Sequence, residues 1–572
     1  MGVPGFFLWL LKKYKNRHFI LNQNNNLGTI DSLLIDTNCL LHPQCFKILA
    51  ENCKLKDHDE LERKMINACI EYLDYMIKYC DPKKEIYIAI DGVAPVAKIK
   101  QQRQRRFKSV NDRVLFDNIK KKHNKEISTF WNNSAITPGT EFMLKLTKRI
   151  TEYCKSIKFK GKVLFSTANT PSEGEHKLLQ HIKKTNNNNY TYVIYGLDAD
   201  LIFLALAANR KNIYLLREAQ EFANNSEKTN VTKLNYISID ILKECIIDEI
   251  KEQLCDDLIE RDKKIDEERI IRDFIFICYF LGNDFLPHIP SIDIKCYNKK
   301  CINGLDLLLQ GYINTFDNLE DYIIRINENN DISYNDVFLQ MFIDYLASFE
   351  DEFFMNMYNT KKNYRKSNDL DAYESEKFKI ENLQFKINDD IELGKDDSND
   401  YKFRYYKKNY LTEINQHEIV KFASYKYLEG LLWVANYYFK DCPSWEWYYP
   451  YDHAPFISDL ADNFKRFNID EIKFNIGEPL KPIEQLFCVL PKQSDYLLPS
   501  DLKWLMNNTK SPIIHLYPDN FEIDLLYKTK YWQGIAILPD LEIGNIKNVL
   551  SQHANYNDEK NRLKDVLIFE TI

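Results

Sequence analysis

Three short runs of apolar residues each end in aspartate: Leu33-Leu34-Ile35-Asp36, Ile86-Tyr87-Ile88-Ala89-Ile90-Asp91 and Tyr192-Val193-Ile194-Tyr195-Gly196-Leu197-Asp198. Runs of this kind, without alternation between apolar and polar residues, are typical of strands that are buried on both faces of a parallel sheet. Segments with helical patterns lie between them, at 61–80, 98–126 and 140–157. This order predicts an α/β fold with a mainly parallel sheet flanked by helices.

Composition limits the class of protein. The chain has 572 residues, and its 77 Lys and Arg against 84 Asp and Glu give a formal net charge of −7. This balance excludes a basic coat over the whole surface but leaves room for a local basic patch. The 13 cysteines form no Cys-x-x-Cys pair, which disfavours a zinc ribbon. No apolar run approaches the length of a membrane span, and we expect a soluble intracellular protein. We also expect a monomer, with the cytoplasm favoured and the nucleus left open.

Composition also divides the chain into four predicted parts. Residues 1–310 carry the α/β pattern. Residues 311–400 become polar and charged toward their end, which favours a helical and partly disordered linker. Aromatic residues crowd into 401–545 and predict a second, mainly helical region packed on the first. Residues 546–572 are expected to form a C-terminal tail.

Acidic residues at the strand ends are the main chemical signal. The carboxyl ends of parallel strands meet at one edge of a sheet, where ligands bind. Two acid-x-acid pairs, Glu173-Gly174-Glu175 and Asp198-Ala199-Asp200, accompany the strand-end aspartates, and Asp284 follows another apolar run. The full set of candidate acids is Asp36, Asp91, Glu173, Glu175, Asp198, Asp200 and Asp284.

These acids predict a site for hard divalent cations. Carboxylates that lie a few ångströms apart raise one another's pKa unless a cation neutralises them, and ligand sets made only of oxygen suit Mg²⁺ or Mn²⁺. Two such ions about 4 Å apart can stabilise the attacking oxygen and the leaving oxygen when a phosphodiester bond is hydrolysed. A turn or a helix cap is the commoner role for any single acid, but the set as a whole favours a metal site.

A segment without acids follows Asp91. Residues 92–111 contain no Asp or Glu, and Lys98, Gln102, Arg105 and Arg106 fall on one face if the segment is helical. Most basic runs of this length are solvated surfaces. Here the run begins seven residues after a candidate metal ligand, so we expect its basic face to bind a phosphate close to the metals.

Aromatic residues offer a second means of binding nucleic acid, because their faces stack on unpaired bases. His42, Trp445 and Trp447 are candidates for this role, although packing in the core is the commoner fate of an aromatic side chain. The spacing of Trp433, Tyr437 and Tyr438 indicates a packed helix face instead.

These residues lie in motifs by which the chain resembles the 5′→3′ exoribonucleases of the XRN family. The resemblance covers nearly the whole chain except about 311–400 and the end. The motifs are Met1-Gly-Val-Pro-Gly-Phe-Phe, Ile35-Asp-Thr-Asn-Cys-Leu-Leu-His-Pro, Ala89-Ile-Asp-Gly-Val-Ala-Pro, Gln101-Gln-Arg-Gln-Arg-Arg-Phe, Ile136-Thr-Pro-Gly-Thr-Glu-Phe-Met, Glu173-Gly-Glu-His-Lys, Tyr195-Gly-Leu-Asp-Ala-Asp-Leu-Ile, Gly282-Asn-Asp-Phe-Leu-Pro-His, Tyr427-Leu-Glu-Gly-Leu-Leu-Trp-Val and Pro443-Ser-Trp-Glu-Trp-Tyr-Tyr-Pro-Tyr.

The resemblance implies a 5′ nuclease core of the PIN-like type and processive degradation of single-stranded RNA that carries a 5′-monophosphate. It implies two Mg²⁺ ions on the seven acids, with Mn²⁺ able to substitute, and nucleoside 5′-monophosphates as products of mRNA decay or RNA processing. Lys98, Gln102, Arg105 and Arg106 would form the 5′-phosphate pocket, and His42 would stack on a base together with Trp445 or Trp447. It further suggests a short member without the C-terminal extension domains of the large cytoplasmic members.

Some residues depart from the family pattern, and two other functions stay open. Thr37 and Cys39 stand where the family usually has Met and Gly, and neither is a proposed ligand. A flap-type DNA 5′ nuclease would use a similar acid cluster, but the basic segment and the aromatic second region argue against it. An inactive module that binds RNA ends is disfavoured because all seven acids are present.

Overall fold

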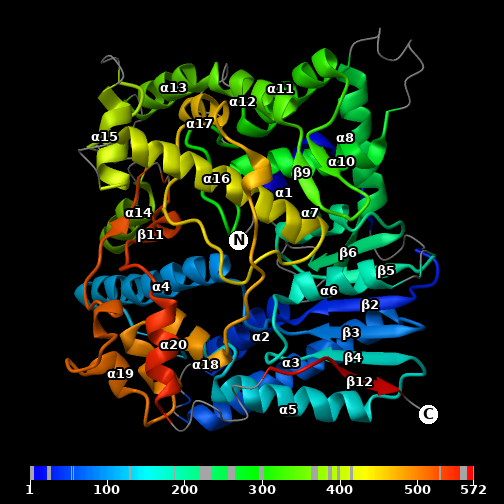
Figure 1. Ribbon diagram of the computed structural model, residues 1–572. Helices are drawn as coiled ribbons and strands as arrows, with labels where there is room; N and C mark the ends of the chain where they lie inside the picture. The colour runs from blue at the N-terminus through cyan, green and yellow to red at the C-terminus, as the bar shows by residue number, and fades with distance from the viewer. Residues whose placement is uncertain are drawn as a thin grey trace.

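The computed structural model of the chain describes residues 5–21, 27–52, 55, 57–127, 131–185, 187, 189–218, 234–254, 265–294, 302–362, 371–383, 390–395, 400–411, 416–526, 528, 530–553 and 563–570. Its centre is an eight-stranded sheet with the strand order β1-β7-β6-β5-β2-β3-β4-β12 (Figure 1). These strands are β1 (Ile20–Leu21), β2 (Ser32–Asp36), β3 (Glu85–Ala89), β4 (Lys162–Ser166), β5 (Tyr192–Tyr195), β6 (Ile213–Glu218), β7 (Leu234–Ser238) and β12 (Leu567–Glu570).

The middle of the sheet is parallel, as the sequence predicts. Strands β6, β5, β2, β3 and β4 run in one direction, whereas β1, β7 and β12 pair antiparallel at the two edges. In this register Asp36 is paired with Ala89, and Ile35 is paired with Tyr195. Asp36, Asp91 and Asp198 therefore follow their strands at the same edge of the sheet.

Helices cover both faces of the sheet. One face packs on α2 (Thr37–Glu51), α3 (His58–Cys80) and α5 (Glu141–Ser156), through side chains that include Leu41, Leu73 and Leu146. The other face packs on α1 (Phe6–Lys13), α6 (Gly174–Lys184), α7 (Asp200–Ala207), α8 (Ile239–Gln253) and α10 (Glu267–Ile277). The helices expected at 61–80 and 140–157 are confirmed by α3 and α5.

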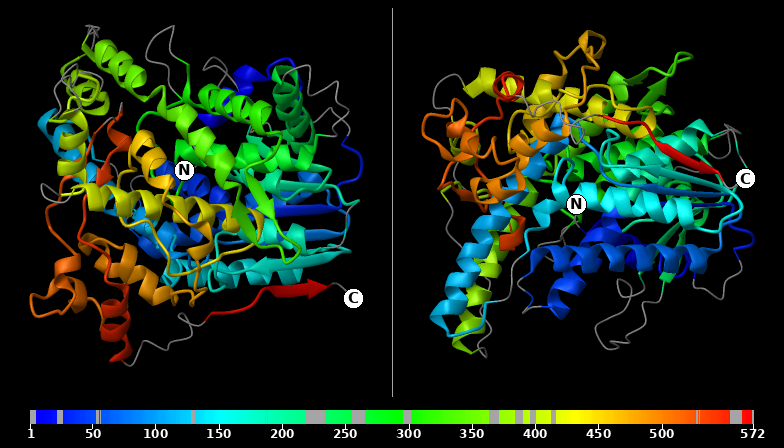
Figure 2. Two further views of the ribbon diagram at one scale, coloured as in Figure 1. Left: turned by 45° about the horizontal axis from the view of Figure 1, so that its top comes forward. Right: turned by 90° about the horizontal axis from the view of Figure 1, so that it is seen from below.

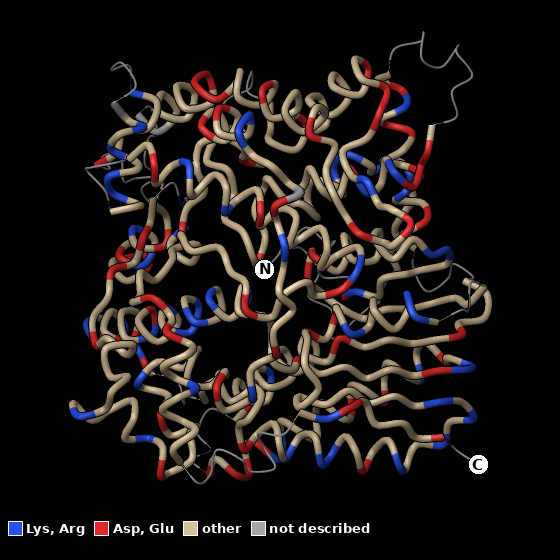
Figure 3. Tube along the Cα trace, viewed as in Figure 1, with Lys and Arg blue, Asp and Glu red and all other residues tan. Residues whose placement is uncertain are grey.

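The basic segment forms α4 (Val96–Lys122), which confirms the helix expected at 98–126. The right panel of Figure 2 shows the far half of α4 extending away from the body of the molecule. There His123, next to its end, and Lys122 contact Glu376 of α14 (Ala372–Glu381). Figure 3 shows Lys and Arg positions along α4, while charges of both signs are mixed over the remaining elements.

The second half of the chain is mainly helical. Besides α14, its α-helices are α11 (Gly304–Leu319), α12 (Asp336–Ala347), α13 (Glu350–Lys362), α15 (Asp400–Asn409), α16 (Gln416–Phe439), α17 (Ile457–Phe464), α18 (Pro482–Val489), the single turn α19 (Trp504–Asn507) and α20 (Ile543–Ser551), among the described residues. Short helical turns lie in the first half of the chain at η1 (Asn133–Ala135) and η3 (Cys278–Leu281), and in the second half at η5 (Ile469–Glu471), η6 (Lys492–Leu497), η7 (Ile514–Leu516) and η8 (Tyr531–Gln533). Two small hairpins pair β8 (Ile324–Ile326) with β9 (Ile332–Tyr334) and β10 (Ile523–Asp524) with β11 (Ile535–Ala536).

The two halves share hydrophobic cores. Trp433, Tyr437 and Tyr438 of α16 are buried in the cluster that lies against the sheet, which confirms them as a packed helix face. A separate cluster joins Ile99 and Phe107 of α4 to α18 and α20. These shared cores hold the second region against the strand edge that carries the acids.

Two predicted parts have more packed structure than their description suggests. Within 311–400, α12 packs into the main core, and Phe354 of α13 is buried among aromatic residues of α15. Residues 363–370, 384–389 and 396–399 lie outside the described residues, so disorder there stays a prediction. The expected tail contributes the end of α20 and the edge strand β12, while 554–562 lie outside the described part. In the part of the chain that the structure describes, no helix has the length and apolar character needed to cross a membrane.

Candidate active site

Asp36 and Asp91 are held together by one asparagine. Asp36 is the N-cap of α2 and accepts a hydrogen bond from the Asn38 backbone N–H at 3.2 Å. The Asn38 side chain donates its Nδ2 to Asp91 Oδ2 at 2.7 Å, and its Oδ1 accepts from the Asp91 backbone N–H at 3.2 Å. Asn38 therefore fixes the relative position of two strand-end carboxylates.

Gly174 brings the second acid pair against the first. Its backbone N–H donates to Asp91 Oδ1 at 2.6 Å. A Cβ atom on Gly174 would lie 2.7 Å from Asp36 Oδ1, so any side chain there would collide with the carboxylate. Glu173 and Glu175 flank this glycine at the start of α6, so both acids lie next to the Asp36 and Asp91 carboxylates.

The remaining acids approach from other elements. Asp200 opens α7 and is buried, whereas Asp198, just before it, is exposed. Asp284 follows η3 and is buried, and its Oδ1 accepts from Gln101 Nε2 of α4 at 2.7 Å. Lys98 forms ion pairs with both Asp284 and Glu173, the latter at 2.8 Å between Nζ and Oε1.

Burial, together with repulsion between the acids, raises the pKa values of four of them. Burial, followed by repulsion from Asp91, raises the pKa of Asp36 well above its ordinary range. Burial and the Glu173 charge raise the pKa of Asp91 to about 6, and burial and the Asp284 charge raise that of Asp200 to about 7. Burial and the Asp198 charge also raise the pKa of Glu175 well above its ordinary value. Carboxylates with raised pKa values have a deficit of positive charge around them.

Lys98 supplies positive charge to two of these acids, Glu173 and Asp284. Burial alone would lower its pKa, but the charges of Asp284 and Glu173 raise it well above the ordinary value for lysine. The same ion pair holds the pKa of Asp284 below its ordinary value, in opposition to burial. Lys98 therefore lies with its ammonium among the acids, rather than only beside the arginines as the resemblance suggests.

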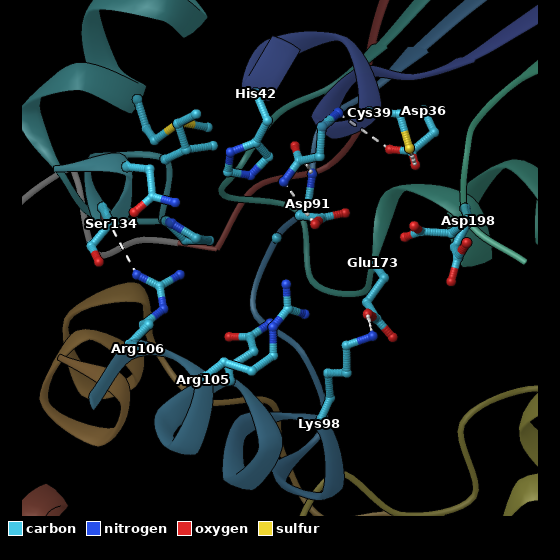
Figure 4. Close-up of a pocket in the computed structure, with 18 of the residues that line it drawn as sticks. Asp36, Cys39, His42, Asp91, Lys98, Arg105, Arg106, Ser134, Glu173 and Asp198 are labelled. Atoms are coloured by element: carbon cyan, nitrogen blue, oxygen red, sulfur yellow. Dashed lines mark hydrogen bonds and ion pairs between the residues drawn. The ribbon is translucent and has the colours of Figure 1, made fainter. Parts of the chain in front are cut away.

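A cavity of about 460 Å³ joins the acids to the basic face of α4. Its acidic side includes Asp36, Asp91, Glu173, Glu175 and Asp198. Its basic side includes Lys98, Gln102, Arg105 and Arg106, so all four residues predicted from helical spacing line it. Figure 4 shows Arg105 and Arg106 on one side of this space, with Asp91, Glu173 and Asp198 across from them.

The two arginines have no acidic partner in the described part of the chain. Arg106 Nη1 donates weakly to the Ser134 carbonyl oxygen at 3.4 Å, and neither Arg105 nor Arg106 forms an ion pair with a described carboxylate. Burial and then the neighbouring Arg105 lower the pKa of Arg106 to about 10. Two cationic side chains that face a cavity and pair with no described carboxylate are suited to bind an anion.

Other basic residues of α4 have structural roles. Arg103 is buried and donates to the Leu516 carbonyl oxygen at 2.6 Å. Lys108 pairs with Asp112 one turn further along the helix. The helix therefore separates a face that lines the cavity from a face that packs on the second region.

The acids fit divalent cations in their chemistry. Among the described residues, no group donates a hydrogen bond to the buried oxygens Asp200 Oδ1 and Glu175 Oε2, so both can serve as cation ligands. Among the described residues no group of three or more acidic, His or Cys side chains is already gathered closely enough to hold a metal ion. Asp284 lines a neighbouring cavity of about 490 Å³ that also reaches Asp198, and Asp200 lines neither cavity. The carboxylates thus lie around a common region, but no three of the described ones are close enough together to bind one ion.

The candidate stacking residues are placed differently from one another. His42 lines the cavity, and burial and the Arg106 charge lower its pKa to about 4, which leaves its ring neutral at pH 7. Trp447 stacks on Trp433 with ring centroids 5.3 Å apart and donates to Glu429 at 2.8 Å. Trp445 is packed against the main core. Neither tryptophan lines the cavity, so the structure does not bring either of them to His42.

Sequence reasoning missed several residues of this site. Asn38 could have been found from its place two residues after Asp36. Gln485 of α18 lines the cavity, and Tyr437 of α16 donates to Glu173 Oε2 at 3.1 Å. No sequence pattern points to Gln485 or Tyr437, because each of them reaches the site from a helix that is far away in the chain.

Two protein-family profiles match this chain. The profile described as XRN 5′-3′ exonuclease N-terminus matches residues 1–219. The profile described as Xrn1 helical domain matches residues 264–386 and 360–569, which together span more than half of the chain. The chain belongs to the XRN family of 5′-3′ exonucleases.

Individual relatives of the XRN family agree with this assignment. The chain is 30% identical to human 5′-3′ exoribonuclease 1 over 98% of its own length and 35% of that relative's length. It is 29% identical to 5′-3′ exoribonuclease 2 of Debaryomyces hansenii, over 100% of its own length and 72% of that relative's. It is also 29% identical to 5′-3′ exoribonuclease 1 of Schizosaccharomyces pombe, where it covers 99% of itself and 49% of that relative. The chain thus spans between about a third and three quarters of these relatives.

Proposed function

We propose that this chain is a metal-dependent 5′→3′ exoribonuclease that degrades single-stranded RNA with a 5′-monophosphate to nucleoside 5′-monophosphates. The observation that carries the proposal is the shared cavity, which is lined by acids on one side and by Arg105 and Arg106 on the other. An RNA end bound by the arginines would have its first phosphodiester within reach of the acids. The names of the relatives, all 5′-3′ exoribonucleases, support the same direction and substrate.

The proposed cofactors are two Mg²⁺ ions, with Mn²⁺ able to substitute. Hard cations prefer carboxylate oxygens, and the unpartnered oxygens of Asp200 and Glu175 offer such ligands. Bound ions would supply a deprotonated water and stabilise charge on the leaving oxygen. The ligands we propose are Asp36, Asp91, Glu173, Glu175, Asp198, Asp200 and Asp284.

The residues of the chain would position the RNA end. Arg105 and Arg106 would bind the 5′-phosphate, and the neutral His42 ring would stack on a leading base. Hydrolysis that breaks the bond to the 3′ oxygen of the first nucleotide leaves the phosphate on the second one. The shortened RNA therefore carries the same 5′-monophosphate, which lets the pocket bind it again and supports processive degradation.

A time course with end-labelled RNA tests the proposal. RNAs of one sequence would carry a 5′-monophosphate, hydroxyl, triphosphate or cap, and each would be incubated with and without Mg²⁺. We expect mononucleotides to be released from the monophosphate RNA only when Mg²⁺ is present. Asp200→Ala should abolish release while binding of the same RNA survives, because this residue is proposed to hold metal rather than RNA.

Other outcomes would point to the two alternatives. Faster cleavage of a DNA flap than of single-stranded RNA would indicate a structure-specific DNA nuclease. Binding of 5′-monophosphate RNA without any metal-dependent release would indicate an inactive module. The nine described cysteines all carry free thiols, as expected for a reducing compartment, but the compartment and the monomeric state stay predictions.

A further inference from the structure

Gln485 connects the second region to the basic face of α4. It lies on α18, its side chain is 1% exposed, and it lines the cavity that holds the acids and the arginines. Its Oε1 accepts a hydrogen bond from the Ala94 backbone N–H at 3.1 Å. Its Nε2 donates to Gln102 Oε1 at 3.4 Å.

The order of these two hydrogen bonds is dictated by chemistry. A backbone N–H can only donate, so Ala94 requires the carbonyl end of the Gln485 amide. The amino end of Gln485 then remains for Gln102 and requires the carbonyl end of that second amide. Gln102 is therefore held with its own amino group turned away from α18.

This orientation matters because Gln102 lies between Lys98 and the two arginines on the cavity face of α4. An amide presents either a donor or an acceptor to a ligand, according to which end faces it. Only the donor end attracts a phosphate, whereas the carbonyl oxygen would repel it. The fixed order of bonds thus selects the end that suits an anion.

We propose that Gln485 is a positioning residue for 5′-phosphate specificity, which acts by orienting the Gln102 amide through a relay that begins at the Ala94 backbone. This inference rests on the proposed function, because it assumes that the cavity binds a 5′-phosphate. In this proposal the second region takes part in recognising the RNA end, because the basic face of α4 alone does not fix the orientation of the Gln102 amide.

The substitution Gln485→Glu tests the relay. A carboxylate accepts hydrogen bonds at both oxygens, so the contact with Ala94 can persist while Gln102 must turn its amino group toward α18. The Gln102 carbonyl oxygen would then face the phosphate. We expect kcat/KM for 5′-monophosphate RNA to fall about 10-fold, mainly through KM, with no change for the slow turnover of 5′-hydroxyl RNA.

Three further variants separate orientation from damage to the fold. Gln485→Met removes both hydrogen bonds with little change in volume and should lower the preference for 5′-monophosphate RNA to a smaller degree. Gln485→Glu introduced into Gln102→Ala should cost less than it does in the wild-type chain, since no amide remains to be turned and only repulsion between the new carboxylate and the phosphate is left. Cys488→Ala changes a buried residue of the same helix that does not line the cavity, and it should leave the preference unchanged.

The outcomes distinguish this inference from the function on which it rests. A wild-type chain that does not prefer 5′-monophosphate over 5′-hydroxyl RNA would overturn the proposed function, and the relay with it. A wild-type preference that persists in both Gln485→Glu and Gln485→Met, in chains that melt like the wild type, would overturn the relay alone. Equal losses from Gln485→Glu with and without Gln102 would also reject it.

Discussion

At the scale of single residues, the site depends on how closely side chains and backbone approach each other. Asn38 binds Asp91 through both ends of its amide, and Gly174 donates its N–H to the same carboxylate. Both contacts hold an acid in place against repulsion from its neighbours. Neutral groups, the Asn38 amide and the Gly174 N–H, thus help to hold Asp91 in the acid cluster.

Gly174→Ala tests this close approach. The added Cβ would lie 2.7 Å from Asp36 Oδ1 and 3.2 Å from the Ala89 carbonyl oxygen, so an acid or the backbone must shift. A displacement of reacting groups by about 1 Å commonly costs about 100-fold in rate, and we expect kcat to fall by that order. Steady-state kinetics on 5′-monophosphate RNA measures it.

A matched control is available in α20. A Cβ on Gly544 would meet no atom within 4 Å, so Gly544→Ala should keep full activity. Its melting temperature should be unchanged or raised, because alanine is favoured over glycine within a helix. Full activity in Gly174→Ala as well would contradict the role given to Gly174.

The raised pKa values predict how cations act on stability. Burial raises the pKa of Asp91 to about 6 and that of Asp200 to about 7, both from an ordinary value of 3.8. Between pH 4 and 7 the folded chain therefore keeps protons that the unfolded chain has lost. The contribution of these two carboxyl groups to the stability of the metal-free protein therefore falls as pH rises through this window. Above it both carboxylates are ionised and uncompensated.

Mg²⁺ should therefore stabilise the chain more at pH 8 than at pH 5.5, because it binds the ionised carboxylates. At 100 times its dissociation constant a ligand adds about 2.7 kcal/mol, which corresponds to a rise of a few degrees in melting temperature. Thermal melts with and without Mg²⁺ at both pH values measure the difference, and Asp200→Asn should reduce it. An equal rise at both pH values would argue against binding at these acids.

At the scale of elements, α4 illustrates what a sequence can and cannot predict. The 3.6-residue repeat alone placed Lys98, Gln102, Arg105 and Arg106 on one face, and all four line the cavity. The apolar strand runs similarly predicted the edge where Asp36 and Asp91 lie. Both predictions rest on the local geometry of a helix or a strand, which does not depend on how distant parts of the chain pack.

Contacts between distant elements could not be predicted in this way. Gln485 and Gln102 are 383 residues apart, and no local pattern connects them. The ion pairs of Lys98 with Glu173 and Asp284 depend in the same way on how α4 lies against α6 and η3. The choice between Trp445 and Trp447 was also open, and the structure places both outside the cavity because they pack on α16 and the main core.

The two faces of α4 can be separated by substitution. Arg106→Ala removes from the cavity a guanidinium that pairs with no described carboxylate, and we expect at least 10-fold less discrimination between 5′-monophosphate and 5′-hydroxyl RNA, without loss of thermal stability. Arg103→Ala instead removes a buried hydrogen bond to the Leu516 carbonyl and should lower the melting temperature while discrimination persists. Competition assays and thermal melts on both variants measure the contrast. Loss of discrimination in Arg103→Ala alone would reverse the assignment of the faces.

At the scale of the whole molecule, the second region completes a site whose charged residues all come from the first half. Ile99 and Phe107 of α4 are buried against α18 and α20. Tyr437 binds Glu173 and stacks on His176 with ring centroids 4.1 Å apart. These contacts hold α4 and α6, which carry the two sides of the cavity, in a fixed relation. The second region therefore supports the active site through packing and through hydrogen bonds from neutral side chains rather than through ionised groups.

Division of the chain between residues 383 and 390 tests this dependence. A fragment of residues 1–383 retains all seven candidate acids and the four residues of the α4 face, but it loses α16, α18 and α20. Exposure of Ile99, Phe107 and the surrounding apolar surface should make the fragment associate with itself, and its turnover of 5′-monophosphate RNA should fall at least about 100-fold. Co-expression with residues 384–572 should restore a soluble complex and most of the activity, because the shared cores would form again. Size-exclusion chromatography and the end-labelled RNA assay measure both effects. A monomeric 1–383 fragment with the activity of the whole chain would show that the acids and α4 keep their arrangement without the second region.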